Sequence, residues 1–248
     1  MILIAGKAVQ PEEINGAYVQ NSVQKEIAQI LFSSNVEYNY DSLEQLQFEM
    51  QLRSEIIASA RALNQSDMAF AIFRKTRCNP TYWERTEEGG FALKRGQNPS
   101  SAIRNIFENG SQYATECATA MMIVYYKALL SVYTESHFNQ LFPSIELMNW
   151  HHIDPLLKEV GTMKARKGYL PGDRRYFSNP DVDPLEPQWQ GENVIDLGRG
   201  LYYGHGIGLY SAETIIQSLN QNRAEDADQS AYLDDSAGRP NFKKLAGI

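Results

Sequence analysis

The sequence predicts an α+β fold in which a central helix packs on an antiparallel sheet. Two observations support this class. Helical spacing of apolar residues dominates up to about residue 133, and the most apolar of these stretches begins at Cys117. From residue 133 to residue 210, short strand-like runs alternate with turn residues. Helices followed by a meander of strands are typical of α+β domains, in which helices cover an antiparallel sheet.

The first part of the chain predicts a strand and then two helices. Ile2–Ile4 is a short β-rich run, and Pro11-Glu12-Glu13 marks the start of a helix. An amphipathic helix follows over residues 41–63, with Asp41 or Ser42 as its N-cap. Its apolar positions keep helical spacing: Leu43, Leu46, Phe48, Leu52, Ile56, Ile57 and Ala60.

A hairpin and a short helix precede the central helix. Residues 68–73 form a short apolar run, and the β-rich runs 81–85 and 91–95 flank the turn sequence Glu87-Glu88-Gly89-Gly90, which predicts a hairpin. Residues 101–107 predict a short helix. Gly110 interrupts the helical pattern, and both Ser111 and Thr115 are plausible N-caps of the helix that contains Cys117.

The second half predicts strands, one late helix and a polar tail. Strands are expected at 145–150, 169–177, 193–197 and 201–210, and a helix at 211–219. From about residue 220 the chain is polar, and we expect an irregular surface segment. Residues 1–248 should form a single catalytic domain.

Composition excludes several classes of protein. The net charge is −7 and no basic stripe is present, so nucleic acid is not an expected partner. The segment Met1-Ile-Leu-Ile-Ala5 is too short for a signal sequence, which predicts synthesis and folding in the cytosol. Thr119 and Lys127 interrupt the apolar run after Cys117, well short of the ~20 residues that span a bilayer, so no membrane association is expected.

Cys117 is the candidate nucleophile. A thiol in the first turn of a helix lies beside unpaired backbone N–H groups and the positive end of the helix dipole, and both favour the reactive thiolate. The alternative is an inert buried cysteine. The other cysteine, Cys78, has no helix-start context and no nearby base, which indicates a structural role.

Candidate partners of the thiol come from later strands. His205 lies in Tyr202-Tyr-Gly-His-Gly-Ile-Gly208, where the glycines would let a substrate approach the imidazole. Glu192 begins the preceding strand, so neighbouring antiparallel strands could hold both near one thiol. Glu116 precedes Cys117 and is either a further catalytic carboxylate or a favourable charge at the helix start.

Tryptophans near strand ends are candidates for the walls of a substrate passage. Taken alone, each of Trp150 and Trp189 is typical of core or rim packing; together near a thioester-forming cysteine they would screen it from water. No dinucleotide loop or Ca²⁺ loop has the required spacing, and adjacent His151 and His152 would point to opposite faces of a strand. We therefore expect neither a cofactor nor a metal.

Three motifs resemble the bacterial spore-coat protein-glutamine gamma-glutamyltransferases, the small transglutaminases of spore-forming bacilli. They are Tyr113-Ala-Thr-Glu-Cys-Ala-Thr-Ala, Gln188-Trp-Gln-Gly-Glu-Asn-Val-Ile and Tyr203-Gly-His-Gly-Ile-Gly. Further similar stretches occur in the same order, so the resemblance extends over almost the whole chain: Asn79-Pro-Thr-Tyr-Trp83, 99–110, Tyr176-Phe-Ser-Asn-Pro180 and Gln229-Ser-Ala-Tyr-Leu233.

The resemblance implies a papain-like core with extra peripheral helices and calcium-independent cross-linking of glutamine- and lysine-bearing spore coat proteins. Made in the cytoplasm of the sporulating cell, the protein would associate with the spore coat. Cys117 corresponds to the family's nucleophile, Glu192 to its principal acid, His205 to its histidine and Glu116 to a partly redundant carboxylate. The aromatics that correspond to its passage are Trp150, Trp189, Tyr176 and Phe70.

Two other functions remain open on the residues alone. A cysteine hydrolase, such as a cell-wall peptidase, an amidase or a glutamine deamidase, would use the same nucleophile in an open cleft. A coat or scaffold protein without activity would use Cys117 only for packing.

Overall fold

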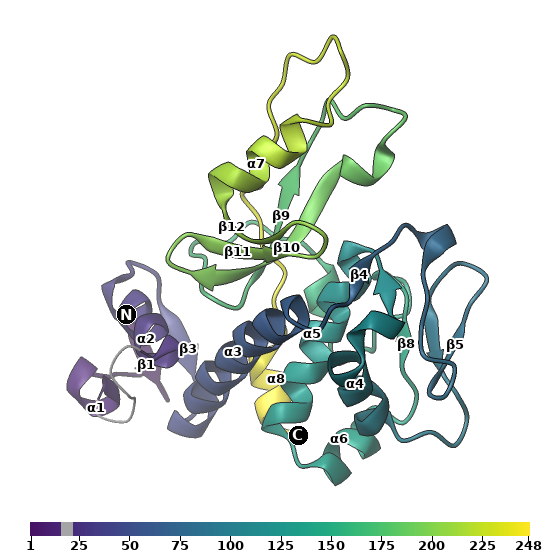
Figure 1. The fold of residues 1–248 in the computed structure, drawn as a ribbon. Coiled ribbons are helices and arrows are strands. Elements are labelled where there is room, and N and C mark those ends of the chain that lie inside the picture. The colour runs from purple at the N-terminus through teal and green to yellow at the C-terminus, as the bar shows by residue number, and fades with distance from the viewer. Residues whose placement is uncertain (16–21) are drawn as a thin grey trace.

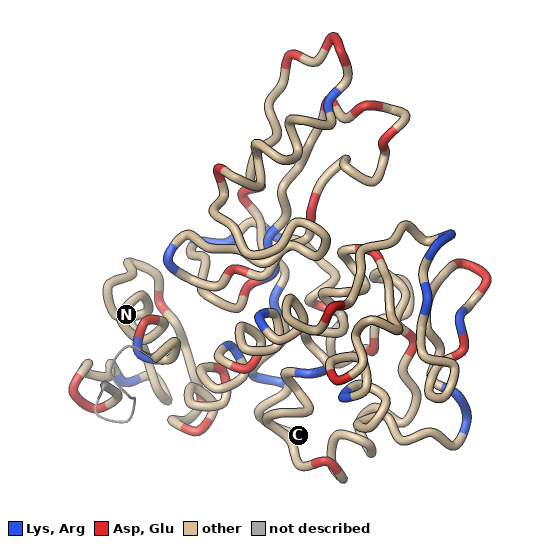
Figure 2. Tube along the Cα trace, viewed as in Figure 1, with Lys and Arg blue, Asp and Glu red and all other residues tan. Residues whose placement is uncertain are grey.

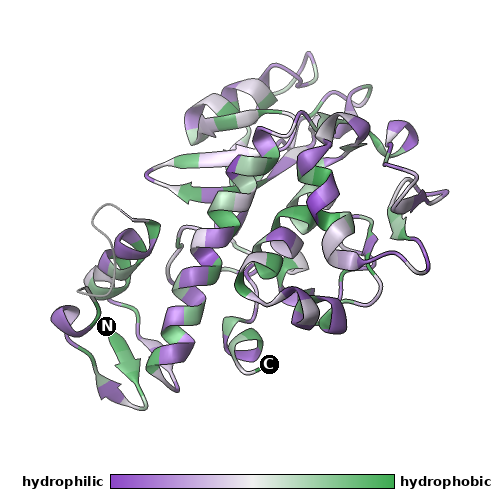
Figure 3. Ribbon diagram, turned by 60° about the horizontal axis from the view of Figure 1, so that its bottom comes forward, coloured by the Kyte–Doolittle hydropathy of each residue, from purple (hydrophilic) through white to green (hydrophobic). Residues whose placement is uncertain are grey.

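Helix α5 (Cys117–Val132) forms the centre of the molecule in the computed structural model, which describes residues 1–15 and 22–248 (Figure 1). Most of its side chains are fully buried, because the helix is covered on several sides. Helix α3 (Leu43–Asn64) packs along it, with Leu52 and Ile56 in the same core as Met122 and Tyr126. Hydrophilic and hydrophobic residues alternate along α3 (Figure 3), as expected of a helix with one face in solvent.

A five-stranded antiparallel sheet covers α5, in the order β12-β11-β10-β9-β13. Side chains on β10 alternate between its two faces. Ile195 belongs to the core around α5, whereas Val194 packs with Ile215 of α7 on the other face. The strands are β9 (Arg174–Ser178), β10 (Gly191–Gly198), β11 (Leu201–Gly204), β12 (Gly208–Ser211) and β13 (Tyr232–Leu233), and α7 spans Ala212–Asn220.

Smaller elements surround this centre (Figure 1). A three-stranded sheet has the order β5-β6-β8, and β4 pairs in parallel with β7, which leads directly into α5. A second three-stranded sheet, β2-β1-β3, packs with α1 and α2 around a separate N-terminal core. The bounds are β1 (Ile2–Ile4), β2 (Lys7–Ala8), α1 (Pro11–Asn15), α2 (Val23–Ser33), β3 (Tyr38–Tyr40), β4 (Ala69–Phe70), β5 (Trp83–Arg85), β6 (Phe91–Leu93), α4 (Pro99–Glu108), β7 (Ala114–Thr115), α6 (Glu135–Leu141), β8 (Glu146–Leu147) and α8 (Phe242–Ala246). Short 3₁₀ helices occur at η1 (Phe73–Lys75), η2 (Gly110–Gln112), η3 (Lys158–Gly161) and η4 (Pro187–Trp189).

The α+β class and the helix-on-sheet packing are confirmed. The expected strand over 201–210 is wrong in one respect, because it is a hairpin of β11 and β12. Gly206, in the turn, and Gly208, the first residue of β12, have φ of +99° and +111°, which favour glycine and reverse the chain between the two strands. Helices α2 and α6 were not predicted. The sequence does carry a signal for α2, because Ser22 caps it and Val23, Ile27 and Leu31 keep helical spacing, whereas α6 is only seven residues long.

The polar segment after residue 220 is irregular and largely exposed, as expected, only as far as residue 230. Residues 232–246, the C-terminal strap, contribute β13 and α8 and cross the molecule beside β9. Ala237 and Leu245 are fully buried, and Phe242 is 6% exposed. Polar and small residues make up most of this segment, so its few buried side chains form no periodic apolar pattern.

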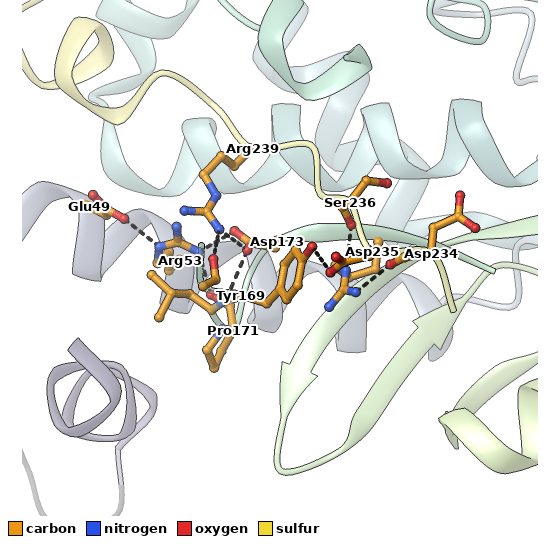
Figure 4. A network of polar contacts seen from close by, with 12 residues as sticks. Glu49, Arg53, Tyr169, Pro171, Asp173, Asp234, Asp235, Ser236 and Arg239 are labelled. Carbon is orange, nitrogen blue, oxygen red and sulfur yellow. Dashed lines mark hydrogen bonds and ion pairs between the residues drawn. The ribbon is translucent and has the colours of Figure 1, made fainter. Parts of the chain in front are cut away.

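Buried polar contacts fix the strap to the body (Figure 4). The carboxylate of Asp173 accepts hydrogen bonds from Arg53 of α3 (2.9 Å) and from Arg239 of the strap. The guanidinium of Arg175 donates to the carbonyls of Asp234 and Ser236, both at 2.8 Å. Both partners of the Arg53–Asp173 pair are fully buried, so removing either one would leave the cluster of Glu49, Arg53, Asp173 and Arg239 with an unbalanced charge.

Among the helices of residues 1–15 and 22–248, none combines the length and the apolar character that a bilayer crossing requires.

Candidate active site

Cys117 is the first residue of α5, and Glu116 is the N-cap of that helix. The Glu116 carboxylate accepts the N–H groups of Ala118 (2.5 Å) and Thr119 (2.7 Å). The expected N-caps are therefore wrong: Ser111 belongs to η2 and Thr115 to β7. The pairing of β7 with β4 fixes the chain up to Thr115, so the cap and the thiol directly follow a rigid strand.

A cavity of about 1010 Å³ opens beside Cys117. Three of the four predicted passage aromatics line it, namely Phe70, Trp150 and Tyr176. Other walls come from the loop before β10, in which Leu185 is 86% exposed and marks the opening. The thiol thus lies on the wall of a hollow with aromatic sides.

Trp189 does not line this cavity. Its side chain packs on the small core between the sheet and α7, which contains Phe177, Val194 and Tyr202. Its carbonyl accepts a hydrogen bond from Asn179 Nδ2 at 2.9 Å. The proximity of Trp189 to Glu192 in sequence was misleading, because residue 189 ends the 3₁₀ helix η4 before β10 begins.

Glu192 lies at the start of β10 and is 5% exposed. Gly204 on the adjacent strand leaves room for it, since a Cβ there would lie 2.9 Å from Glu192 Cγ. Burial raises the pKa of Glu192 well above its usual range, and the charge of Glu116 raises it further. Oε1 of Glu192 has no hydrogen-bond partner among the described residues, so this oxygen is free to take up a proton.

The pKa of the Cys117 thiol is raised, not lowered as its place at a helix start predicts. Burial is the largest cause, followed by the charges of Glu192 and Glu116. The N–H groups of Ala118 and Thr119 in the first turn of α5, which would stabilise a thiolate, already bind Glu116. The resting sulfur is therefore a protonated thiol that needs a base.

His205 is buried and held by two hydrogen bonds. Its Nε2 lies 3.2 Å from the carbonyl oxygen of Ala69, and its Nδ1 lies 3.2 Å from the hydroxyl of Tyr203. A carbonyl only accepts, so Nε2 carries the proton and Nδ1 accepts from Tyr203. Burial lowers the pKa of His205 to about 4, against the backbone hydrogen bonds that oppose this shift. The ring is neutral and connects the end of β11 to β4.

The glycines around His205 have a different role from the one expected. They were predicted to open the imidazole to a substrate. Gly204 makes room for Glu192, and a Cβ on Gly206 would lie 2.9 Å from the Phe70 ring. Both glycines therefore allow close packing inside the site.

Two polar residues beside the thiol were missed from the sequence. Asn193 Nδ2 donates to Cys117 Sγ at 3.4 Å, and Asn193 Oδ1 accepts from Arg174 of β9. The Arg174 guanidinium lies 4.2 Å from the centre of the Trp150 ring. A signal was present, since Asn193 and Arg174 are polar residues within β-rich runs.

The described residues contain no group of three or more His, Cys, Asp or Glu side chains arranged to hold a metal ion. The titratable groups at this site are a buried thiol, two carboxylates with raised pKa values and a neutral histidine.

A solved structure with this fold defines the class of the protein. The transglutaminase from Geobacillus stearothermophilus, solved without its C-terminal extension, superposes with a TM-score of 0.78 and 47% sequence identity, over 83% of this chain and 97% of that one. The chain is thus similar to a bacterial transglutaminase in both fold and sequence.

The sequence comparisons give the family. The family model described as protein-glutamine gamma-glutamyltransferase matches residues 1–248. Relatives with that name include one from Bacillus mycoides (strain KBAB4), 43% identical, and one from Bacillus cereus (strain 03BB102), 42% identical. Each alignment covers 99% of this chain and 88% of the relative. The chain belongs to the protein-glutamine gamma-glutamyltransferases, and it is a transglutaminase that transfers the acyl group of a protein-bound glutamine to an amine.

Proposed function

We propose that Cys117 is the nucleophile of this transfer, that Glu192 is its base, and that the substrates are proteins of the spore coat. The observation that carries the assignment is the position of Cys117 on the cavity wall, close enough to two buried carboxylates for their charges to raise the pKa of its thiol.

Acylation would begin with proton transfer from the thiol to Glu192 as Sγ attacks the side-chain carboxamide of glutamine. The S–C bond forms while the carbonyl π electrons move to oxygen. Collapse of this intermediate breaks the C–N bond, and the proton leaves with nitrogen as ammonia. A carboxylate whose pKa is raised is a stronger base, which suits it to a thiol whose pKa is also raised.

Deacylation would transfer the acyl group to a lysine side chain. The lysine ammonium has an ordinary pKa near ~10.4 and must lose a proton before its nitrogen can attack. Glu192 would accept that proton. The amine then displaces the sulfur, which gives an ε-(γ-glutamyl)lysine cross-link and restores the thiol.

The charge of the loops near the opening favours a cationic acceptor. Acidic residues are concentrated in the loops at the top of the molecule (Figure 2), and one of these loops supplies Pro184 and Leu185 to the cavity wall. Their negative field would raise the local concentration of lysine side chains. The acidic residues of these loops are Asp181, Asp183, Glu186, Glu225, Asp226 and Asp228.

Glu116 and His205 would have supporting roles in this mechanism. Glu116 caps α5, and its charge contributes to the raised pKa of Glu192. His205, neutral and bonded at both nitrogens, would hold β4 and β11 in register around the thiol.

The experiment that tests the assignment uses casein and a fluorescent primary amine, with and without a chelator. Incorporation of the amine that disappears in Cys117→Ala supports it. A gain of one mass unit at glutamine without amine incorporation would instead identify a deamidase. The coat substrates are tested by mass spectrometry of coat fractions from spores with and without the gene, since loss of isopeptide-linked peptides is expected in its absence.

A further inference from the structure

Asn193 contacts the reacting sulfur from the sheet. The residue shares a face of β10 with Ile195, which belongs to the core around α5, and its side chain is directed at the start of that helix. Nδ2 lies 3.4 Å from Cys117 Sγ, and both residues line the cavity. A donor in this position is within reach of any group bonded to the sulfur.

Arg174 fixes the orientation of that amide. One end of its guanidinium donates to Asn193 Oδ1, so the NH₂ group of Asn193 must face the thiol. Nε of Arg174 donates to the Val160 carbonyl at 2.8 Å, and the plane of the group lies against Trp150. Arg174 is 3% exposed and forms no ion pair with a carboxylate among the described residues. Arg174 is thus a buried positive charge, and the Asn193 amide lies between it and the sulfur.

The backbone N–H of Cys117 is a second donor at the same place. It donates to no protein acceptor in residues 1–15 and 22–248, whereas the next two N–H groups bind Glu116. The carbonyl oxygen of a bound carboxamide becomes an anion as Sγ attacks, and paired donors already in place stabilise such an oxyanion most effectively.

We propose that the side-chain amide of Asn193, oriented by Arg174, and the backbone N–H of Cys117 together form the oxyanion hole of the acyl transfer. Asn193 is then a catalytic residue and Arg174 a positioning residue. The inference rests on Cys117 as the nucleophile. In the attack, the two π electrons of the carbonyl move to oxygen, Asn193 and Cys117 donate to that oxygen, and the electrons return when ammonia leaves.

A comparison of two reactions of Cys117 tests the proposal. Glutamine transfer passes through an oxyanion, whereas alkylation by iodoacetamide displaces iodide and forms none. Asn193→Ala should lower kcat/KM for amine incorporation by about 10²- to 10³-fold while alkylation at the same pH changes by less than about tenfold. Asn39→Ala, an exposed asparagine of β3, is the control and should change neither rate. Equal losses in both reactions would overturn the proposal, because Asn193 would then act only on the thiol.

A double-mutant cycle tests the role of Arg174. If Arg174 acts through Asn193, Arg174→Lys should reduce the rate of transfer in the parent but reduce it little further in the Asn193→Ala background. Additive losses would refute the positioning role. Melting temperatures check that the variants are folded. If Asn193→Ala does not fold, Asn193→Thr, which places a polar residue of high β-propensity in the strand, should likewise lower transfer far more than alkylation. If Cys117→Ala loses both reactions, and every Asn193 variant slows transfer and alkylation equally, Cys117 remains the nucleophile and only the oxyanion proposal is wrong.

Discussion

Replacing His205 with glutamine should remove a pH-dependent contribution to stability. The folded state holds the pKa of His205 at about 4, against an ordinary value of 6.5. As pH falls below 6.5, the unfolded chain takes up a proton that the folded chain does not bind until about pH 4, so stability is lost over this window. With these two pKa values, the loss between pH 7 and pH 5 is about 2 kcal/mol. Glutamine can donate to Ala69 and accept from Tyr203 but does not titrate.

The measurement is urea unfolding of parent and His205→Gln at intervals between pH 7 and pH 5. The difference between the two unfolding free energies isolates the histidine, because the buried acids Glu116 and Glu192 are common to both proteins and titrate in the opposite sense. The parent should lose about 2 kcal/mol more than the variant on acidification. His151→Gln is the matched control, because that side chain is exposed. Parallel curves for parent and His205→Gln would show that the folded and unfolded chains bind the histidine proton over the same pH range, and the argument that burial keeps the ring neutral would be wrong.

Three further predictions concern the chemistry. Glu192→Gln should lower kcat/KM for amine incorporation by about 10²-fold or more. Glu116→Gln should lower activity less, and because it weakens the N-cap of α5 it should cost about 1 kcal/mol of stability. A larger loss of activity in Glu116→Gln would exchange the roles of the two residues. Trp150→Ala should raise the ratio of deamidated glutamine to isopeptide, because Trp150 lines the cavity. Trp189→Ala should lower the melting temperature and leave that ratio unchanged. Peptide mass spectrometry measures the ratio. Cross-linking should persist in excess EDTA, and loss of activity that Ca²⁺ restores would contradict this.

Local patterns were sufficient to predict the central elements of the fold. The helix predicted over 41–63 is α3, and the hairpin predicted around Gly89-Gly90 is formed by β5 and β6. The apolar helix that begins at Cys117 is α5. They are marked by apolar residues at helical spacing, by a long apolar run and by a turn with defined chemistry, so residues near in sequence determine them. The C-terminal strap has none of these, because its few buried residues are fixed by contacts with β9 and α3 that lie far away in sequence.

Local sequence patterns were likewise insufficient to predict the whole active site. Spacing and residue type were enough to select Cys117, Glu192 and Glu116 as candidates. They could not give the pKa of the thiol, because that depends on burial and on a carboxylate 75 positions away in the chain (residue 192 minus residue 117). The contact of Asn193 with the sulfur required the register of β10 against its neighbours, which no local pattern specifies.

The network around Asp173 also affects when activity arises during folding. Its carboxylate joins segments 120 and 66 residues away along the chain, and Arg174, the next residue, orients Asn193. Contacts of such long range form late, because the chain entropy lost in closing large loops must be overcome first. Partly folded copies therefore have a cysteine but no assembled site around it. An enzyme that joins proteins irreversibly is in this way inactive toward its neighbours until its own fold is complete.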